Sequence, residues 1–247
     1  MSFHALVIFL VCAFGAEVIG TMAGFGAATV LTPVAGLFLD IKTAMAIVAC
    51  FHLFGNASRL YFFGRRINWP VARAFGLVAI ACSFAGAALA AWLPSPAIRL
   101  LLGGFLILYS ASETFRLTAL RVPSSTKALV TGGVVSGTIS GLIGTGGAIR
   151  SVCLLAYGLS KDVYIGTSAA IALVVDATRI PVYLTQGFIP ASFVPIVLGL
   201  TVIAFAGSWA GQRLVRLISP VWFKRFVLVM LLLMGMKLAL DGWQGIR

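Results

Sequence analysis

Two glycine-rich segments lie inside apolar runs that are too long for a single membrane span. Residues 20–26 read Gly-Thr-Met-Ala-Gly-Phe-Gly, and residues 140–147 read Ser-Gly-Leu-Ile-Gly-Thr-Gly-Gly. A helix that restarts after such a turn directs unpaired N–H groups and its positive dipole end at the turn, where glycine lets an anion approach closely. The alternative is that these glycines only allow close helix packing. We predict a substrate-binding site for an anion at the two tips, formed by Gly24, Phe25, Gly26, Ala27, Gly144, Thr145, Gly146 and Gly147.

Arg150 is the deepest cation of the chain, one helical turn beyond the second tip. A charged side chain at the centre of a membrane helix costs about 2.5–3.5 kcal/mol on insertion scales, so it needs a partner or a function. We predict that Arg150 faces the bound anion. The alternative is an ion pair with Glu17, and both interpretations hold if substrate or a proton breaks that pair. Thr167 and Ser168 offer hydroxyl donors to the anion, unless they bond the carbonyls of their own helix.

Further polar residues occupy equivalent places in two apolar runs. Arg59, close to Arg65, is expected to reach the membrane interface. Arg179 follows Asp176 by three residues on one helix face, where an intrahelical ion pair is possible. Asn56 and Asp176 share one symmetric position and are expected to line the path. The predicted pathway or coupling residues, with a coupling proton or cation left open, are Glu17, Asn56, Arg59, Asp176 and Arg179.

The sequence contains no pattern typical of an enzyme. Gly-x-Ser-x-Gly, His-Glu-x-x-His and paired carboxylates are missing. Neither glycine tip has the Gly-Lys-Ser/Thr ending of a nucleotide-binding loop, which argues against ATP-driven transport by this chain alone. His4 and His52 are too few, and too far from any cysteine pair, to hold a metal ion. We expect neither enzymatic activity nor a cofactor or metal.

The composition indicates which medium, water or lipid, surrounds the helices that carry these residues. Of the 247 residues, 61% are hydrophobic and 10% are charged, whereas soluble domains have roughly 45–50% apolar and ~25% charged residues. The net charge of +12 comes from Lys and Arg that mostly lie at the ends of apolar runs. This pattern is typical of membrane topology signals and not of a nucleic-acid partner. Residues 1–247 are therefore predicted to form a single domain in a lipid bilayer.

Eight apolar runs follow one another along the chain. A membrane helix needs about 20 residues, since the hydrocarbon core is ~30 Å thick and a helix rises ~1.5 Å per residue. Six runs fit single spans, whereas the first and fifth are predicted to be two half-helices joined at a glycine tip. The runs are 4–37, 42–63, 70–93, 97–115, 127–158, 162–186, 190–212 and 221–240.

The two halves of the chain match each other at an offset of 120 residues. Gly24 then falls on Gly144 and Pro70 on Pro190, with no gap between these positions. An ordered series that includes glycine, arginine and proline is harder to obtain by chance than matches among apolar residues. We predict an internal duplication with a first repeat at 1–122 and a second at 123–247.

The basic residues distinguish two topologies. Of the 18 Lys and Arg, Arg59, Arg150 and Arg179 lie inside apolar runs, which leaves 15 near run ends. These divide eight to seven if every run crosses the membrane, but eleven to four if the first and fifth runs are re-entrant hairpins. Only the second division follows the positive-inside rule. It makes the two repeats inverted and lets the two tips, entering from opposite faces, meet near the midplane.

The predicted fold is therefore an all-α polytopic membrane protein. It consists of two inverted repeats, each a re-entrant broken-helix hairpin followed by three transmembrane helices. Both termini are expected on the periplasmic side of a bacterial inner (cytoplasmic) membrane, because the basic loops lie inside.

Two segments resemble a known family. They are GFGAATVLTPVAGLFLDIKTA at 24–44 and GTGGAIRSVCLLAYGLSKDVYIGTS at 144–168, each a glycine-rich turn followed by a short polar joint. Both resemble the TauE/SafE family, also called the 4-toluene sulfonate uptake permeases. The most specific part is 144–148 together with 166–168, and the first copy departs from it with Ala27 in place of a glycine. The resemblance implies transport of sulfur-containing oxyanions such as sulfite, sulfonates, sulfoacetate or thiosulfate.

We therefore expect a secondary transporter, a permease or exporter, for a small sulfur-containing anion bound at the midplane. One alternative is a channel-like facilitator for another small solute. The other is a membrane accessory subunit without transport of its own. The oligomeric state, the direction of transport and the coupling ion stay open.

Overall fold

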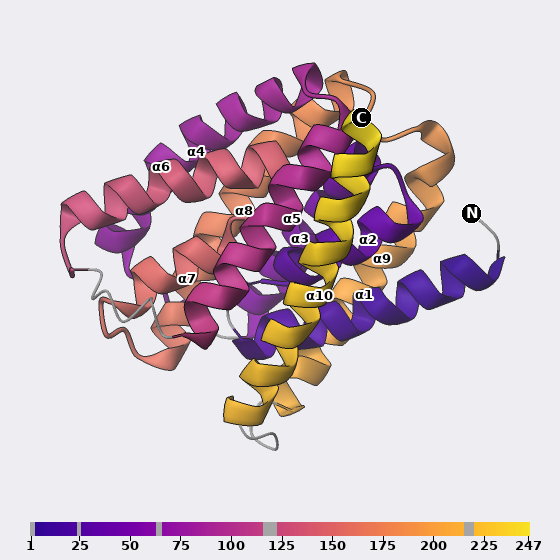
Figure 1. Ribbon diagram of the computed structural model, residues 1–247. Coiled ribbons are helices and arrows are strands. Elements are labelled where there is room, and N and C mark those ends of the chain that lie inside the picture. The colour runs from indigo at the N-terminus through magenta and orange to yellow at the C-terminus, as the bar shows by residue number, and fades with distance from the viewer. Residues whose placement is uncertain (1–2, 24–25, 63–65, 116–122, 215–219) are drawn as a thin grey trace.

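The computed structural model describes residues 3–23, 26–62, 66–115, 123–214 and 220–247. All regular structure in these ranges is helical (Figure 1), and eight of the helices are long and apolar enough to cross a membrane. This confirms the predicted all-α polytopic membrane protein. The helices are α1 (Phe3–Ala23), α2 (Ala28–Phe38), α3 (Ile41–Phe62), α4 (Trp69–Trp92), α5 (Ser95–Thr114), α6 (Thr126–Ile143), α7 (Gly147–Leu155), α8 (Lys161–Thr185), η2 (Ala191–Phe193), α9 (Val194–Leu214) and α10 (Pro220–Ile246).

The first and fifth apolar runs are broken helices with unequal arms. Their long arms, α1 and α6, have 21 and 18 residues, whereas their short arms, α2 and α7, have 11 and 9. The prediction of two half-helices was therefore wrong for the long arms. Glycine in a helix costs only about 1 kcal/mol, so the earlier glycines do not end them. The turns contain glycines with positive φ, Gly26 at 92° and Gly144 at 83°, a conformation that other residues rarely adopt.

Each short arm folds back beside the start of its own long arm. The rings of Phe9 in α1 and Phe38 in α2 lie 6.2 Å apart between centroids. Ser124, just before α6, donates to the carbonyl of Ala156 at the end of α7, at 2.6 Å. Each broken helix is therefore a hairpin with its turn inside the molecule.

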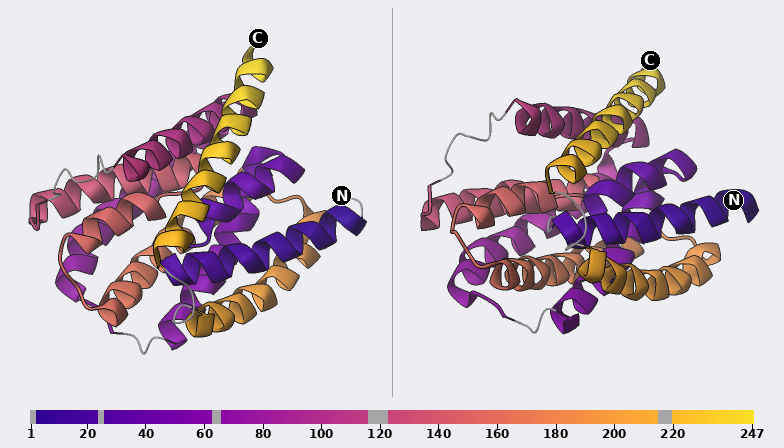
Figure 2. Two further views of the ribbon diagram at one scale, coloured as in Figure 1. Left: turned by 60° about the horizontal axis from the view of Figure 1, so that its bottom comes forward. Right: turned by 90° about the horizontal axis from the view of Figure 1, so that it is seen from below.

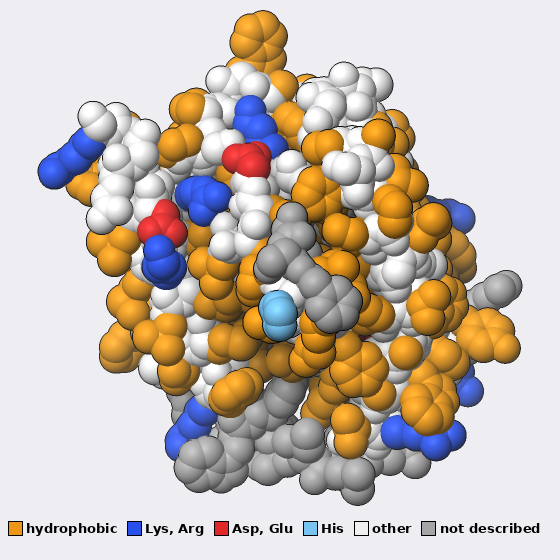
Figure 3. Space-filling model, turned by 90° about the vertical axis from the view of Figure 1, so that its right-hand side faces the viewer, with side chains coloured by type: hydrophobic (Ala, Val, Ile, Leu, Met, Phe, Trp, Pro, Cys, Tyr) orange, Lys and Arg blue, Asp and Glu red, His pale blue; other side chains and the backbone are white. Residues whose placement is uncertain are grey.

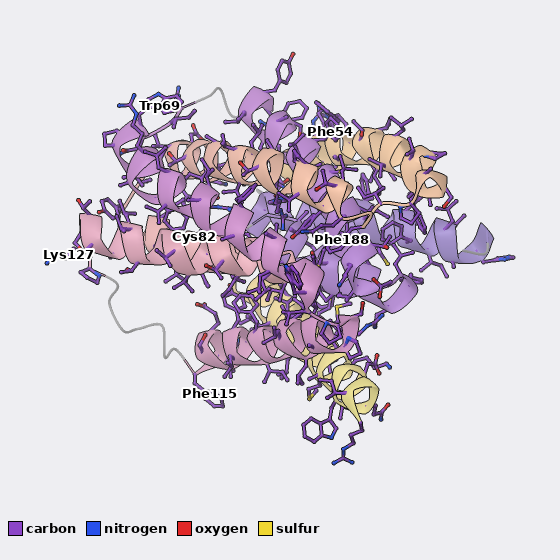
Figure 4. The ribbon with its side chains drawn as sticks, turned by 90° about the horizontal axis from the view of Figure 1, so that it is seen from above. Phe54, Trp69, Cys82, Phe115, Lys127 and Phe188 are labelled. Carbon is purple, nitrogen blue, oxygen red and sulfur yellow. The ribbon has the colours of Figure 1, made fainter. Side chains whose placement is uncertain are left out.

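The two hairpins open toward opposite ends of the helix bundle. Lys42, which follows α2 at the start of α3, donates to the carbonyl of Ala91 at the end of α4, at 3.1 Å. Arg66, between α3 and α4, contacts Asp162 of α8, just after α7, at 3.3 Å. Because α3 runs from the first contact to the second, the hairpin openings lie at its two ends. Figures 1 and 2 show that α1 and α6 start at opposite edges of the bundle. In Figure 4, Lys127 at the start of α6 lies on the opposite side of the molecule from the start of α1.

The main packing contacts between helices of the two chain halves have counterparts in which the two halves have exchanged roles. Helix α4 packs against α6 as α9 packs against α1, and α4 against α8 as α9 against α3. The pairs α3 with α8 and α5 with α10 each unite corresponding helices of the two chain halves. This exchange of partners is what a two-fold relation between the halves requires. The duplication itself and its inversion stay predictions.

The outer surface is largely apolar. Figure 3 shows hydrophobic side chains over most of the face in view. Leu77 of α4, Leu108 of α5 and Val202 of α9 are 67%, 72% and 71% exposed. A soluble protein rarely leaves so much apolar surface in water, whereas lipid is its matching solvent. The chain is therefore a multi-pass membrane protein, and a set of its polar residues is buried between the helices.

Candidate anion site

A series of hydrogen-bonded, buried polar residues starts on α1 and continues on α3; we call it the polar chain. Arg59 Nη2 donates to Glu17 Oε1 at 2.5 Å, and Ser208 of α9 donates to the same oxygen at 2.6 Å. Gly55 makes room for this contact, because a Cβ there would lie 2.6 Å from Glu17 Oε2. Arg59 is only 3% exposed. The prediction that Arg59 reaches the interface was wrong, and so was the alternative pairing of Glu17 with Arg150.

The polar chain continues along one face of α3 and crosses to α8. Arg59 Nη1 donates to Asn56 Oδ1 at 2.8 Å, and Asn56 Nδ2 donates to the carbonyl of His52 at 2.8 Å. His52 Nδ1 lies 2.7 Å from Asp176 Oδ2. The spacing 52, 56 and 59 places three side chains on the same helix face. Asn56 also lies 3.4 Å from Asp176 Oδ2, so the two predicted pathway residues meet.

Arg179 connects the polar chain to the long arm of the second hairpin. Its guanidinium contacts Asp176 Oδ1 at 2.7 Å through Nη2, so the predicted intrahelical pair is present. Its Nη1 donates to the carbonyl of Ser140 in α6 at 2.5 Å, and the hydroxyl of Tyr183 donates to the carbonyl of Gly141. Arg59 and Arg179, the equivalent arginines, thus each bond the long arm of a hairpin.

The second tip packs against the first turn of α2. The hydroxyl of Thr145 donates to that of Thr29 at 2.9 Å, and Thr32 donates to the carbonyl of Gly144 at 3.4 Å. No side chain caps the N-terminus of α2 or of α7, which start after Ala27 and Gly146. Of the predicted tip residues, Gly24 and Phe25 lie outside the described part of the chain. The start of α2 and the second tip therefore meet inside the helix bundle, whereas their position at the membrane midplane stays a prediction.

The glycines of the tips differ in what a side chain would meet. A Cβ on Gly26 would collide with Nε2 of His52, and one on Gly144 would lie 2.8 Å from Cγ of Met45. A Cβ on Gly146 would collide with the carbonyl oxygen of Ser136 on α6. Gly146 therefore also serves the close packing that was the alternative to an anion site. Gly147, the first residue of α7, is buried.

Arg150 lies on α7 behind the second tip and is 3% exposed. Its Nε donates to the hydroxyl of Ser168 on α8 at 3.0 Å, which places two predicted site residues in contact. Thr167 instead accepts from the N–H of Asn68 at 2.9 Å, so its oxygen supports the start of α4. The hydroxyl of Ser168 is the bonding partner that orients the Arg150 guanidinium.

The buried charges of this site do not balance. Within the described residues, the buried charged side chains are three arginines and two carboxylates. Arg59 pairs with Glu17 and Arg179 with Asp176. The third guanidinium, that of Arg150, bonds a hydroxyl and leaves one positive charge in excess. A small anion would neutralise it, and burial would strengthen their attraction.

Sequence reasoning missed part of this site. It considered His52 only as a metal ligand, although the residue lies one turn before Asn56 on a face that also carries Arg59. It also missed the hydroxyl of Thr29 and the carbonyl of Ser140, because their roles depend on contacts between distant helices. The spacing along α3 was the one signal that could have identified His52.

Comparison with known proteins gives one match. No curated protein and no solved structure matches the chain. The family model for the sulfite exporter TauE/SafE matches residues 8–238. That range includes both glycine tips, all eight candidate spans in part or whole, and every polar residue of the site described above. The chain therefore belongs to the TauE/SafE sulfite exporter family.

Proposed function

We propose that this protein is a secondary transporter that binds a small sulfur-containing anion between the two glycine tips. The observation that carries the proposal is the buried guanidinium of Arg150, whose charge no carboxylate of the described site balances. The uncapped starts of α2 and α7 add N–H groups and positive dipole ends at the two tips. Family membership supports transport rather than catalysis.

The substrate class follows from the family together with the donors at the site. Sulfite, sulfoacetate, organosulfonates and thiosulfate all present negatively charged oxygens that a guanidinium and backbone N–H groups can bind. The hydroxyl of Thr29, which accepts from Thr145 at the contact between α2 and the second tip, keeps its own proton and offers a further donor. Each candidate anion would need to lose its water and recover those hydrogen bonds from the tips.

The proposed mechanism is alternating exposure of this site between inverted repeats at 1–122 and 123–247. Two features support it: the hairpins open toward opposite ends of the bundle, and the main packing contacts between the two chain halves have counterparts with the roles exchanged. Inverted repeats with binding at broken helices are a recurring design of secondary transporters. The eleven-to-four division of basic residues supports a bacterial inner membrane with both termini in the periplasm.

Flux into liposomes that contain only this protein tests the proposal. We expect labelled sulfite, thiosulfate or sulfoacetate to enter at a rate that saturates with concentration. The variant R150Q should lose most of this flux, whereas R213Q should keep it, because Arg213 is exposed and stacks on Trp209 with its Cζ 4.1 Å from the ring centroid. Flux that never saturates would indicate a channel, and no flux for any anion would indicate an accessory subunit.

A further inference from the structure

His52 presents one ring nitrogen to the first glycine tip. The residue is 3% exposed, and its Nδ1 lies 2.7 Å from Asp176 Oδ2. The other nitrogen, Nε2, is buried and has no hydrogen-bond partner among the described residues. It points at Gly26, because a Cβ on that glycine would collide with Nε2. An unpartnered buried nitrogen is costly, so its position at the uncapped start of α2 calls for a ligand.

The contacts of Asp176 determine which ring nitrogen carries the proton. Its Oδ1 accepts from the guanidinium of Arg179 at 2.7 Å, and its Oδ2 lies 3.4 Å from the amide nitrogen of Asn56. That amide is oriented with its nitrogen as donor, because its oxygen accepts from Arg59. A carboxylate surrounded by donors is ionised and can only accept. His52 therefore donates through Nδ1, and in the neutral ring Nε2 carries a lone pair.

This tautomer links the protonation of His52 to the binding of an anion. A lone pair on Nε2 would repel an anion oxygen at the first tip, whereas a protonated Nε2 would donate a charged hydrogen bond to it. We propose that the anion binds together with one proton on His52 Nε2, so that the transporter moves anion and proton in the same step. The proposal rests on the proposed anion transport. A monovalent anion and one proton would cross without net charge.

The other charged groups around His52 act on its protonation in opposite directions. Asp176 fixes the ring from α8 and favours the proton, while the positive charges of Arg59 and Arg150 oppose it at longer range, and a bound anion would offset them. Arg179 and Glu17 are paired with carboxylate and guanidinium partners. Helix α2 has no titratable side chain, and α9 has only the exposed Arg213. At the equivalent position of the second half stands Ala172, so the two tips differ: one faces a titratable ring and the other a permanent cation.

Proton uptake on binding tests the inference with the purified full chain. Thiosulfate and 4-toluenesulfonate are the first probes, because neither changes its charge between about pH 5 and pH 8, where histidine titrates. Calorimetric titrations in two buffers of different ionisation enthalpy count the protons taken up. At pH values at which the imidazole of the free protein is neutral, we expect the uptake of close to one proton per anion. In that range the affinity for the anion should fall about tenfold for each unit by which the pH rises.

The variant H52Q separates the proton from the anion. The glutamine amide keeps an N–H donor but does not titrate, so we expect binding that is independent of pH, with no proton taken up. H4Q is the matched control, since His4 is exposed on α1 and should leave both quantities unchanged. Sulfite is a third probe, for which the difference in proton uptake between wild type and H52Q is measured.

Three outcomes would overturn the inference. The first is wild-type binding with no proton uptake and no dependence on pH, which leaves the proposed anion site intact. The second is a folded H52Q that still takes up a proton as the wild type does. The third is no binding of any of the three anions, in which case the proposed function fails and proton-linked binding fails with it. Should H52Q not purify as a monodisperse protein, the wild-type proton count decides alone.

Discussion

The buried pair of Glu17 and Arg59 gives the most direct test of the polar chain. The variant R59M removes three hydrogen bonds of the guanidinium: to Glu17 at 2.5 Å, to Asn56 at 2.8 Å and to Thr21 at 3.0 Å. It leaves the Glu17 carboxylate, which is 0% exposed, without its cation. Breaking a buried pair in this way costs about 3–5 kcal/mol, because the remaining charge has lost its counterion.

This cost converts into a melting temperature that detergent-solubilised protein can report. A change of 1 kcal/mol shifts the midpoint by roughly 2–4 °C for a chain of this size, so R59M should melt about 6–20 °C below the wild type. The double variant E17L/R59M replaces both charges with apolar groups and should recover about half of the loss or more, since no buried charge is then left unpaired.

The control for this test is R213M. Arg213 is exposed on α9, where its guanidinium lies over the ring of Trp209, and its replacement should change stability by less than about 1 kcal/mol. An R59M protein that melts like R213M would show that Arg59 points to the membrane interface. A double variant that melts no higher than R59M would show that the two side chains are not energetically coupled. Either result would refute the buried pair.

Three further predictions concern the tips and the topology. G26A should lower the free energy of unfolding by about 1–3 kcal/mol, because alanine is strained at a φ of 92° and would meet the imidazole of α3, whereas G15A, with nothing within 4 Å, should be neutral in a thermal melt. R150Q should keep the apo melting temperature within a few degrees but lose most of the stabilisation that sulfite or thiosulfate gives the wild type, a result that equal stabilisation would contradict. In a cysteine-free background, an impermeant thiol reagent added outside should label T185C and spare K161C, which lie at opposite ends of α8, and the reverse pattern would reject the proposed orientation.

The positions of the broken helices could be predicted from the sequence because glycine there has a specific physical task. Positive φ at Gly26 and Gly144 is a requirement that few other residues meet, and both turns fall within the predicted segments. The unequal arms could not be predicted, since Gly15 and Gly20 also lie in the first run and leave α1 helical to Ala23. A single helical glycine costs too little to mark the end of a helix.

The partners of the buried charges on different helices could not be predicted from the sequence, for a different reason. Glu17 lies on α1, and both Arg59 and Arg150 were within reach of it as long as the packing of the hairpins was unknown. The choice depends on Gly55, whose missing side chain lets the carboxylate lie against α3. The pair of Asp176 and Arg179 was predictable because it lies within one helix, where a spacing of three residues fixes the geometry.

The difference between the two tips has a consequence for how the anion is held. Beside the second tip stands Arg150, which stays charged at any pH of interest, and beside the first stands His52, whose charge depends on pH. Loss of Arg150 should therefore weaken anion binding by the same factor at every pH. Loss of the imidazole in H52Q should instead flatten the pH dependence while binding persists. Parallel shifts of the two variants at all pH values would mean that both tips act as fixed charges, and that anion binding and protonation are not linked.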